Sequence, residues 1–158
     1  MAATTIPSIS SILEELRARL PETGFVAGDI FSWNPIAKEV TYNPTAECAV
    51  ERLLHESGHA LAGHKSYGKD ITLLEMERDA WEQAKKLGHE LLITIDEDVA
   101  QNHLDDYRDW LHARSTCPNC QDTGIQTRSD TYACPACQNT WRVNEARTCQ
   151  LRRYKTSI

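Results

Sequence analysis

The segment LLHESGHALAGH, residues 53–64, combines residue types that can bind a metal ion. His55 and His59 are four positions apart, so on a helix both imidazoles face the same side and can hold one ion. Glu56 lies about 100° further around the helix, within reach of a metal-bound water. Zinc lowers the pKa of such a water to about 7, and a carboxylate can take its proton during attack on a carbonyl group. The HExxH spacing therefore predicts a hydrolytic zinc site with Glu56 as general base. The alternative is a chance match on a histidine-rich helix.

A hydrolytic zinc site needs a third protein ligand, and the sequence offers two candidates. His64 lies five positions after His59, which on a continuing helix turns its ring about 140° away. Gly63 could end the helix and let the chain turn back, but we expect His64 beside the site or on the surface. Glu77 lies within the apolar stripe of the next predicted helix, where burial is costly unless a positive charge meets the carboxylate. We therefore expect Glu77 to be the third ligand, the alternative being a glutamate at the edge of the stripe with its carboxylate in water.

A second metal site is predicted near the C-terminus by two CxxC pairs. CPNC and CPAC are separated by thirteen residues, the signature of a zinc ribbon in which four thiolates close a tetrahedral site. A closed site is structural, and a segment of 45 residues would hardly fold without it. The expected ligands of this structural zinc are Cys117, Cys120, Cys134 and Cys137.

Helices and short strands must position these residues. In chain order we expect a helix over 8–20, a hairpin of two strands within 25–33 and 38–42, and helices over about 43–63, 71–87 and from 97 onward. Asn43 and Pro44 favour a helix start, and Gly88 favours a helix end. Thr94 and Glu97 match a capping box. The cysteine segment contributes short strands, so the sequence predicts an α+β protein: a mainly helical domain with a small hairpin, followed by a small β domain.

Charge divides the chain near the first CxxC pair. Residues 1–113 carry 10 Lys and Arg against 20 Asp and Glu, whereas residues 114–158 carry 7 against 3, so the net charges are −10 and +4. This change predicts a domain boundary near residue 114. With 41% hydrophobic and 25% charged residues, the composition is that of a globular protein. The sequence has no signal-peptide pattern and no apolar run long enough to span a membrane, so we expect a cytoplasmic protein without membrane contact.

HESGH, followed eighteen residues after its last histidine by ERDAW, resembles the gluzincin pattern of HExxH plus a glutamate in an ExxA context on the next helix. Small size and a strand pair before the motif helix are similar to minimal gluzincins and to ImmA/IrrE-type cytoplasmic metallopeptidases. The resemblance covers about residues 25–85 and implies a zincin-like domain. It implies three zinc ligands and a general base at His55, His59, Glu77 and Glu56.

The chain departs from the gluzincin pattern at one position. Many gluzincins have an aspartate after the alanine of ExxA, where this chain has Trp81. The carboxylate that orients a ligand histidine is therefore missing there. Asp79 or another acid is the candidate replacement, and the alternative is a less tightly organised site.

Basic and aromatic residues accumulate in the C-terminal segment and could contact nucleic acid; they are Tyr132, Trp141, Arg142, Arg147, Arg152, Arg153, Tyr154 and Lys155. Zinc ribbons bind protein partners just as often, and a ribbon lying over the chain's own active-site cleft is a third possibility. In layout the chain resembles SprT-like proteases, which pair an HExxH domain with a C-terminal zinc ribbon but use a histidine as third ligand.

These patterns predict a zinc-dependent metallopeptidase with two zinc ions, one catalytic and one structural, that acts on a protein or peptide substrate. The competing hypothesis is a non-catalytic, zinc-stabilised module that binds nucleic acid or a protein. The two hypotheses differ in whether the HExxH helix holds a metal ion in an open site.

Overall fold

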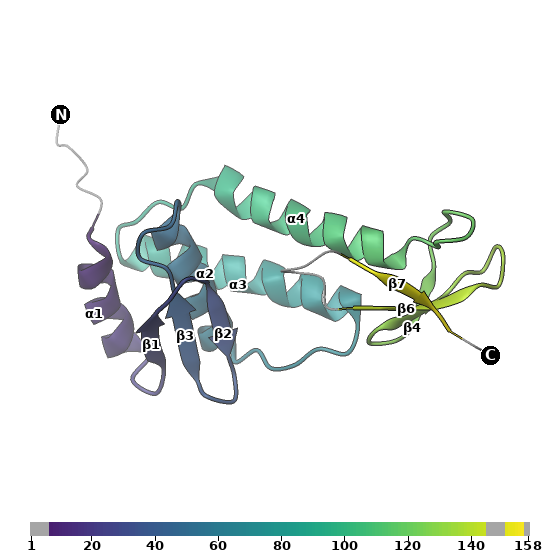
Figure 1. The fold of residues 1–158 in the computed structure, drawn as a ribbon. Helices are drawn as coiled ribbons and strands as arrows, with labels where there is room; N and C mark the ends of the chain where they lie inside the picture. Colours follow the sequence, from purple (N-terminus) through teal and green to yellow (C-terminus); the bar gives the residue numbers. More distant parts are fainter. Residues whose placement is uncertain (1–6, 145–150, 157–158) are drawn as a thin grey trace. The chain divides into compact units, whose positions relative to one another are not determined.

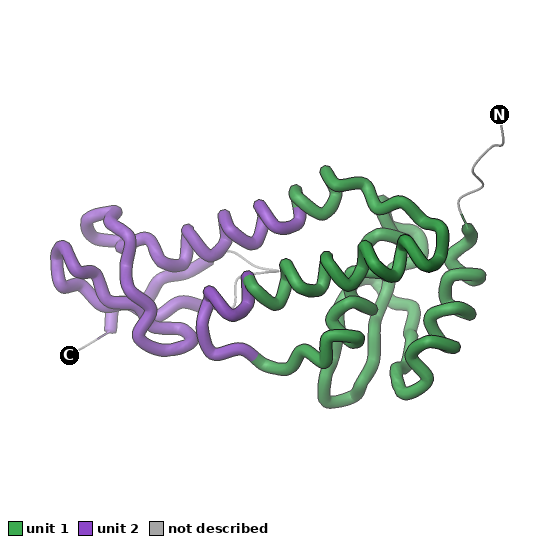
Figure 2. The backbone as a smooth tube through the Cα atoms, turned by 180° about the vertical axis from the view of Figure 1, so that it is seen from behind, with its two compact units in different colours: residues 1–66, 75–102 green, residues 67–74, 103–158 purple. Residues whose placement is uncertain are grey.

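The computed structural model describes residues 7–144 and 151–156 of the chain. These residues form four helices and seven strands (Figure 1). The helices are α1 (Ile9–Arg19), α2 (Ala49–Ala62), α3 (Asp70–Glu90) and α4 (Glu97–Ser115). The chain divides into two compact units, shown in Figure 2. Unit 1 comprises residues 1–66 and 75–102, and unit 2 comprises residues 67–74 and 103–158.

The predicted α+β class is confirmed. Four helices and a small sheet are followed by a small β region that carries the cysteine cluster. The domain boundary near residue 114 stays a prediction about independent folding.

A three-stranded sheet occupies the N-terminal part of unit 1. Its strands are β1 (Gly24–Ala27), β2 (Ser32–Asn34) and β3 (Glu39–Tyr42), in the order β1-β3-β2. The predicted hairpin exists as the antiparallel pair β2–β3, and the side chain of Asn34 accepts the backbone N–H of Ile36 and Ala37 in its turn, both at 3.0 Å. The first predicted strand was wrong as a single element, because it divides into β2 and a separate strand β1 that pairs parallel with β3.

Helix α2 begins later than its sequence suggests. Asn43 caps a turn instead of a helix: its side chain accepts the backbone N–H of Thr45 at 3.1 Å, and its carbonyl accepts that of Ala46 at 3.3 Å. The helix itself starts at Ala49, after Cys48 in the capping position, so the predicted start at Pro44 was five residues early. The predicted end is confirmed, because Gly63 adopts the left-handed conformation (φ 68°) that stops the helix.

The ends of α3 and α4 also differ from expectation. The bond from Leu91 N–H to the carbonyl of Leu87 (2.9 Å) carries helical hydrogen bonding past the predicted stop. Helix α3 therefore continues through Gly88 to Glu90. The capping residue of α4 is Asp96 and not Thr94, because the Asp96 carboxylate accepts the backbone N–H of Asp98 at 2.9 Å.

Helices α2 and α3 touch backbone to backbone inside unit 1. A Cβ atom added to Gly58 would lie 2.2 Å from the carbonyl oxygen of Ala80, which is itself fully buried. A real Cβ atom does not approach an oxygen this closely, so only glycine fits between the two helices. Apolar side chains of α1, α2 and α3 are buried in unit 1; they include Ile12, Leu13, Leu16, Leu53, Leu54, Trp81, Ala84 and Leu87.

The β region of unit 2 is an antiparallel sheet in the order β4-β5-β6-β7. Its strands are β4 (Ile125–Arg128), β5 (Thr131–Ala133), β6 (Thr140–Val143) and β7 (Arg153–Lys155), and the sequence did not predict the last of these. Tyr132 and Trp141 stack in its core with ring centroids 5.6 Å apart, next to two of the cysteines. Burial, together with a hydrogen bond to Asp70 at the start of α3, raises the pKa of Tyr132.

Within the described part of the chain, no helix is both long and apolar enough to cross a membrane.

The close contact at Gly58 predicts that Gly58→Ala destabilises the protein. In an open helix this change would stabilise by about 1 kcal/mol. Here the added Cβ must push α2 and α3 apart, so we expect the free energy of unfolding to fall by roughly 1–3 kcal/mol. Urea denaturation of the zinc-loaded protein measures the change. Gly68→Ala is the matched control, because a Cβ there meets no atom within 4 Å. A Gly58→Ala variant as stable as the wild type would contradict this interpretation.

Candidate metal centre

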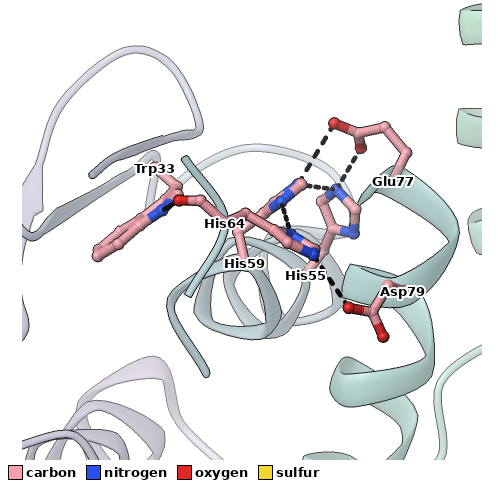
Figure 3. A network of polar contacts seen from close by, with 6 residues as sticks. All are labelled: Trp33, His55, His59, His64, Glu77 and Asp79. Atoms are coloured by element: carbon pink, nitrogen blue, oxygen red, sulfur yellow. Dashed lines mark hydrogen bonds and ion pairs between the residues drawn. The ribbon is translucent and has the colours of Figure 1, made fainter. Parts of the chain in front are cut away.

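Three side chains converge between α2 and α3 in unit 1 (Figure 3). His55 Nε2 lies 2.8 Å from Glu77 Oε2, and His59 Nε2 lies 3.3 Å from Glu77 Oε1. The two Nε2 atoms are 3.2 Å apart. His55, His59 and Glu77 are all buried, with exposed fractions of 1%, 7% and 3% respectively. The sequence singled out these residues, and the structure brings them together as a group that could hold a metal ion.

The local sequence explains how each of the three side chains is placed. His55 and His59 are one helical turn apart on α2, so their rings point to the same side. The ring of Trp81 stacks on His55 with a centroid distance of 4.3 Å and an interplanar angle of 29°. Since Trp81 lies one residue after Ala80, the contact at Gly58 positions both this ring and Glu77, one turn earlier on α3.

The separations between donor atoms suit a zinc ion. Ligand atoms about 2.1 Å from a tetrahedral ion lie roughly 3.4 Å from one another. The His55–His59 and His59–Glu77 distances of 3.2 and 3.3 Å come close to this value. Only the His55–Glu77 pair, at 2.8 Å, would have to open. Two imidazole nitrogens and a carboxylate oxygen are also a donor set that zinc accepts in hydrolytic sites.

The electrostatics of the group favour the protonation states that bind a metal. Burial by itself raises the pKa of Glu77, but hydrogen bonds from His55 and His59 outweigh it and hold that pKa below its ordinary value. Burial lowers the pKa of His55, although the hydrogen bond with Glu77 opposes the shift. The group therefore combines an ionised carboxylate with a neutral imidazole, as a zinc ligand set requires.

Glu56, the predicted general base, follows His55 on α2 and is half-buried, unlike the three candidate ligands. Its role in catalysis stays a prediction.

His64 lies outside the three-residue group but contacts it through the Nδ1 atom of His59 (Figure 3). Its Nδ1 is 2.9 Å from Nδ1 of His59, and its Nε2 is 3.0 Å from Oδ2 of Asp79. Its backbone carbonyl accepts the indole N–H of Trp33 at 2.9 Å. Asp79, named from the sequence as a replacement for the missing orienting carboxylate, therefore reaches a candidate ligand through His64 and not directly.

The four paired cysteines form a second group in unit 2. Cys117 Sγ lies 3.6 Å from Cys137 Sγ, and Cys120 Sγ lies 3.5 Å from Cys134 Sγ. These separations exclude disulfides, whose sulfurs are about 2.05 Å apart. They approach the roughly 3.8 Å expected between thiolates on one tetrahedral zinc.

Backbone N–H groups favour a thiolate at Cys117. Burial raises the pKa of this thiol, but hydrogen bonds from the backbone of Cys120 and Asn119 lower it to about 6. The structure therefore supports metal binding at both predicted groups, and the identity of the ion as zinc stays a prediction.

Three contacts that shape the site of His55, His59 and Glu77 were not predicted from the sequence. They are the backbone contact at Gly58, the stacking of Trp81 and the hydrogen bond from Trp33. A glycine between the two histidines of HExxH was the one available signal, because glycine inside a helix costs about 1 kcal/mol and usually marks a close contact. Trp33 gave no signal, since it lies 31 residues from the carbonyl that it binds.

A hollow of about 460 Å³ lies beside His64 in unit 1. Trp33, Pro35, Lys38 and Lys65 contribute to its wall. None of the three candidate ligands lines it, whereas His64 does.

Comparisons of the chain with protein-family models, with curated proteins and with solved structures find no match.

The zinc content of the purified chain tests both groups. We expect two zinc ions per wild-type chain and one in Glu77→Ala, because two imidazoles alone hold the ion weakly. Glu75→Ala, an exposed glutamate on the same helix, should retain both ions. Metal analysis after dialysis against a weak chelator gives the counts, and far-UV circular dichroism checks the fold of each variant. An unchanged count in Glu77→Ala would assign the third ligand to another residue.

Proposed function

We propose that the chain is a zinc-dependent metallopeptidase of the gluzincin type, with a zincin-like catalytic region and a C-terminal zinc ribbon. The observation that carries this proposal is the buried group of two histidines and a glutamate on neighbouring helices. Structural zinc sites close with four protein ligands, whereas catalytic sites use three and leave a position for water or substrate. The group has three members among the described residues, and the nearby His64 turns to His59 instead of joining them.

In this mechanism His55, His59 and Glu77 would hold the zinc ion. Bound zinc supplies a Lewis acid that polarises the scissile carbonyl and acidifies a water molecule. Glu56 projects from the next position of α2, takes the proton of the attacking water and returns it to the leaving amine. Burial of the three ligands keeps bulk water away and strengthens the charge interactions within the site.

The substrate class that this mechanism implies is a protein or peptide.

The paired, unbridged cysteines support a reducing, cytoplasmic location, because such pairs oxidise readily in oxidising compartments.

A second candidate function, nucleic-acid binding, is favoured by one face of the sheet in unit 2. Strand register aligns Arg128, Thr131, Arg142 and Tyr154 in a row across β4, β5, β6 and β7. Arg152 lies directly before β7. The three arginines and Tyr154 are exposed, and the guanidinium of Arg142 lies over the Tyr154 ring at 4.8 Å from its centroid. Cations beside an aromatic ring suit a phosphate backbone with stacked bases.

The structure removes several of the basic and aromatic residues named from the sequence as candidates for nucleic-acid contact. Tyr132 and Trp141 are core residues and cannot stack on a base. Arg153 donates to the carbonyl of Ala113 through Nη2 at 2.7 Å, and Arg147 lies outside the described residues.

The peptidase mechanism predicts that Glu56→Gln retains both zinc ions and loses hydrolysis. Removal of a general base should lower the rate by at least 100-fold, because the water keeps its proton. A quenched fluorescent peptide library, with metal analysis in parallel, measures activity and zinc content. Glu51→Gln, on the same helix, is the control and should hydrolyse as the wild type does. A Glu56→Gln chain as active as the wild type would rule out this mechanism.

The exposed sheet face predicts salt-dependent binding of a single-stranded oligonucleotide. Combining Arg128→Gln with Arg142→Gln should weaken binding and flatten the plot of log K against log salt by about 1.4, since each lost contact contributes about 0.7. Fluorescence anisotropy between low and moderate salt measures both effects. Arg17→Gln with Lys86→Gln removes the same charge from exposed positions of α1 and α3 and should change neither. Equal behaviour of the two double variants would refute a nucleic-acid site on this face.

A further inference from the structure

His64 is connected through both of its ring nitrogens and its backbone carbonyl (Figure 3). Nδ1 contacts His59, Nε2 contacts Asp79, and the carbonyl accepts the indole N–H of Trp33. We propose that His64 and Asp79 are positioning residues that fix the tautomer and orientation of His59, so that its Nε2 lone pair faces the metal. This inference rests on the metal site of the proposed function, and not on peptide hydrolysis.

Hydrogen-bond chemistry determines the direction of each bond in this chain. An ionised aspartate only accepts, so Asp79 requires the proton of His64 on Nε2. A neutral imidazole that carries its proton on Nε2 has a lone pair on Nδ1, and His64 Nδ1 therefore accepts the bond from His59. In the metal-bound state His59 then carries its proton on Nδ1. Its Nε2, which without a metal donates to Glu77, then presents a lone pair to an ion held between His55 and Glu77.

The backbone explains how His64 reaches His59 from five positions away. Gly63 adopts a left-handed conformation (φ 68°), and His64 N–H returns to the carbonyl of His59 at 3.1 Å. The chain therefore reverses at the end of α2 instead of carrying His64 140° around the helix. Trp33, from β2, then holds the reversed segment by its carbonyl.

This arrangement replaces the direct carboxylate–histidine contact of many zinc sites with a carboxylate–histidine–histidine chain. Partners of this kind fix ring orientation and raise ligand basicity, and their loss typically weakens metal binding 10–100-fold. Trp81, at the position where the gluzincin pattern has an aspartate, stacks on His55, and the acid that reaches His59 through His64 is Asp79, two residues earlier.

The affinity of the three-residue site for zinc tests the proposal. Competition with a chelator, in the full chain with the cysteine group loaded, gives the dissociation constant. We expect His64→Ala to weaken binding 10–100-fold and Asp79→Ala to weaken it less, since His64 alone can still accept from His59. His64→Gln should recover part of the loss, because its amide oxygen can accept the same bond. His89→Ala, an exposed histidine on α3, and Glu75→Ala are the controls and should leave the affinity unchanged.

The double variant shows whether Asp79 affects zinc affinity through His64 or independently of it. If Asp79 acts through His64, combining Asp79→Ala with His64→Ala costs no more than His64→Ala alone. Urea denaturation of each variant reports general loss of structure. A purely structural role predicts reduced stability without rescue of zinc affinity by His64→Gln, and that result would overturn the proposal.

The remaining outcomes distinguish failure of the positioning chain from failure of the peptidase function. Unchanged zinc affinity in His64→Ala, or an undiminished effect of Asp79→Ala in the absence of His64, overturns the positioning chain while leaving the peptidase intact. A wild-type chain that binds zinc only through its cysteines overturns both proposals. The expected affinity pattern in a chain without hydrolytic activity supports the positioning chain and removes the peptidase function.

Discussion

The contact between the backbones of α2 and α3 at Gly58 is the constraint on which the rest of unit 1 depends. The space between Gly58 and the carbonyl of Ala80 admits no side-chain atom. At this separation a side chain one turn before the contact on α3 meets the histidines of α2. The residues on either side of Ala80 therefore acquire their roles from the crossing: Glu77 joins the two imidazoles and Trp81 covers one of them. A wider crossing would leave two histidines without a carboxylate.

The helix crossing brings a buried carboxylate against two imidazoles. Glu77 is almost fully removed from solvent, and a lone carboxylate in such a place would be strongly destabilising. Hydrogen bonds from His55 and His59 keep its charge, as the lowered pKa of Glu77 indicates. The same three groups present their donor atoms to one point. Charge compensation and metal binding are therefore two consequences of a single arrangement, and a divalent cation would satisfy it more fully than the hydrogen bonds do.

The two candidate metal groups differ in a way that fits different roles. Four thiols form a closed set around the core of the small sheet in unit 2, next to the stacked rings of Tyr132 and Trp141. Three mixed donors form an incomplete set between helices, with the half-buried Glu56 next to it. In the proposed function, the closed set would contribute to folding and the incomplete one would leave a coordination position for chemistry. On the sheet face away from its buried rings, the exposed Arg128 and Arg142 lie in a row with Tyr154, so unit 2 combines a buried core with a cationic surface.

The sequence by itself determined the features that depend on local spacing. Two histidines four apart must share a helix face, two CxxC pairs must approach one another to bind a metal, and a glutamate within an apolar stripe must be buried with a partner. Only the tertiary structure decided how distant segments meet. It placed β1 parallel to β3, made Asn43 a turn residue, and joined Trp33, His64 and Asp79 into a chain behind His59. The physical reason is that helical periodicity is written in neighbouring residues, whereas the partner of a hydrogen bond across 15 or 31 residues is fixed by how the elements pack.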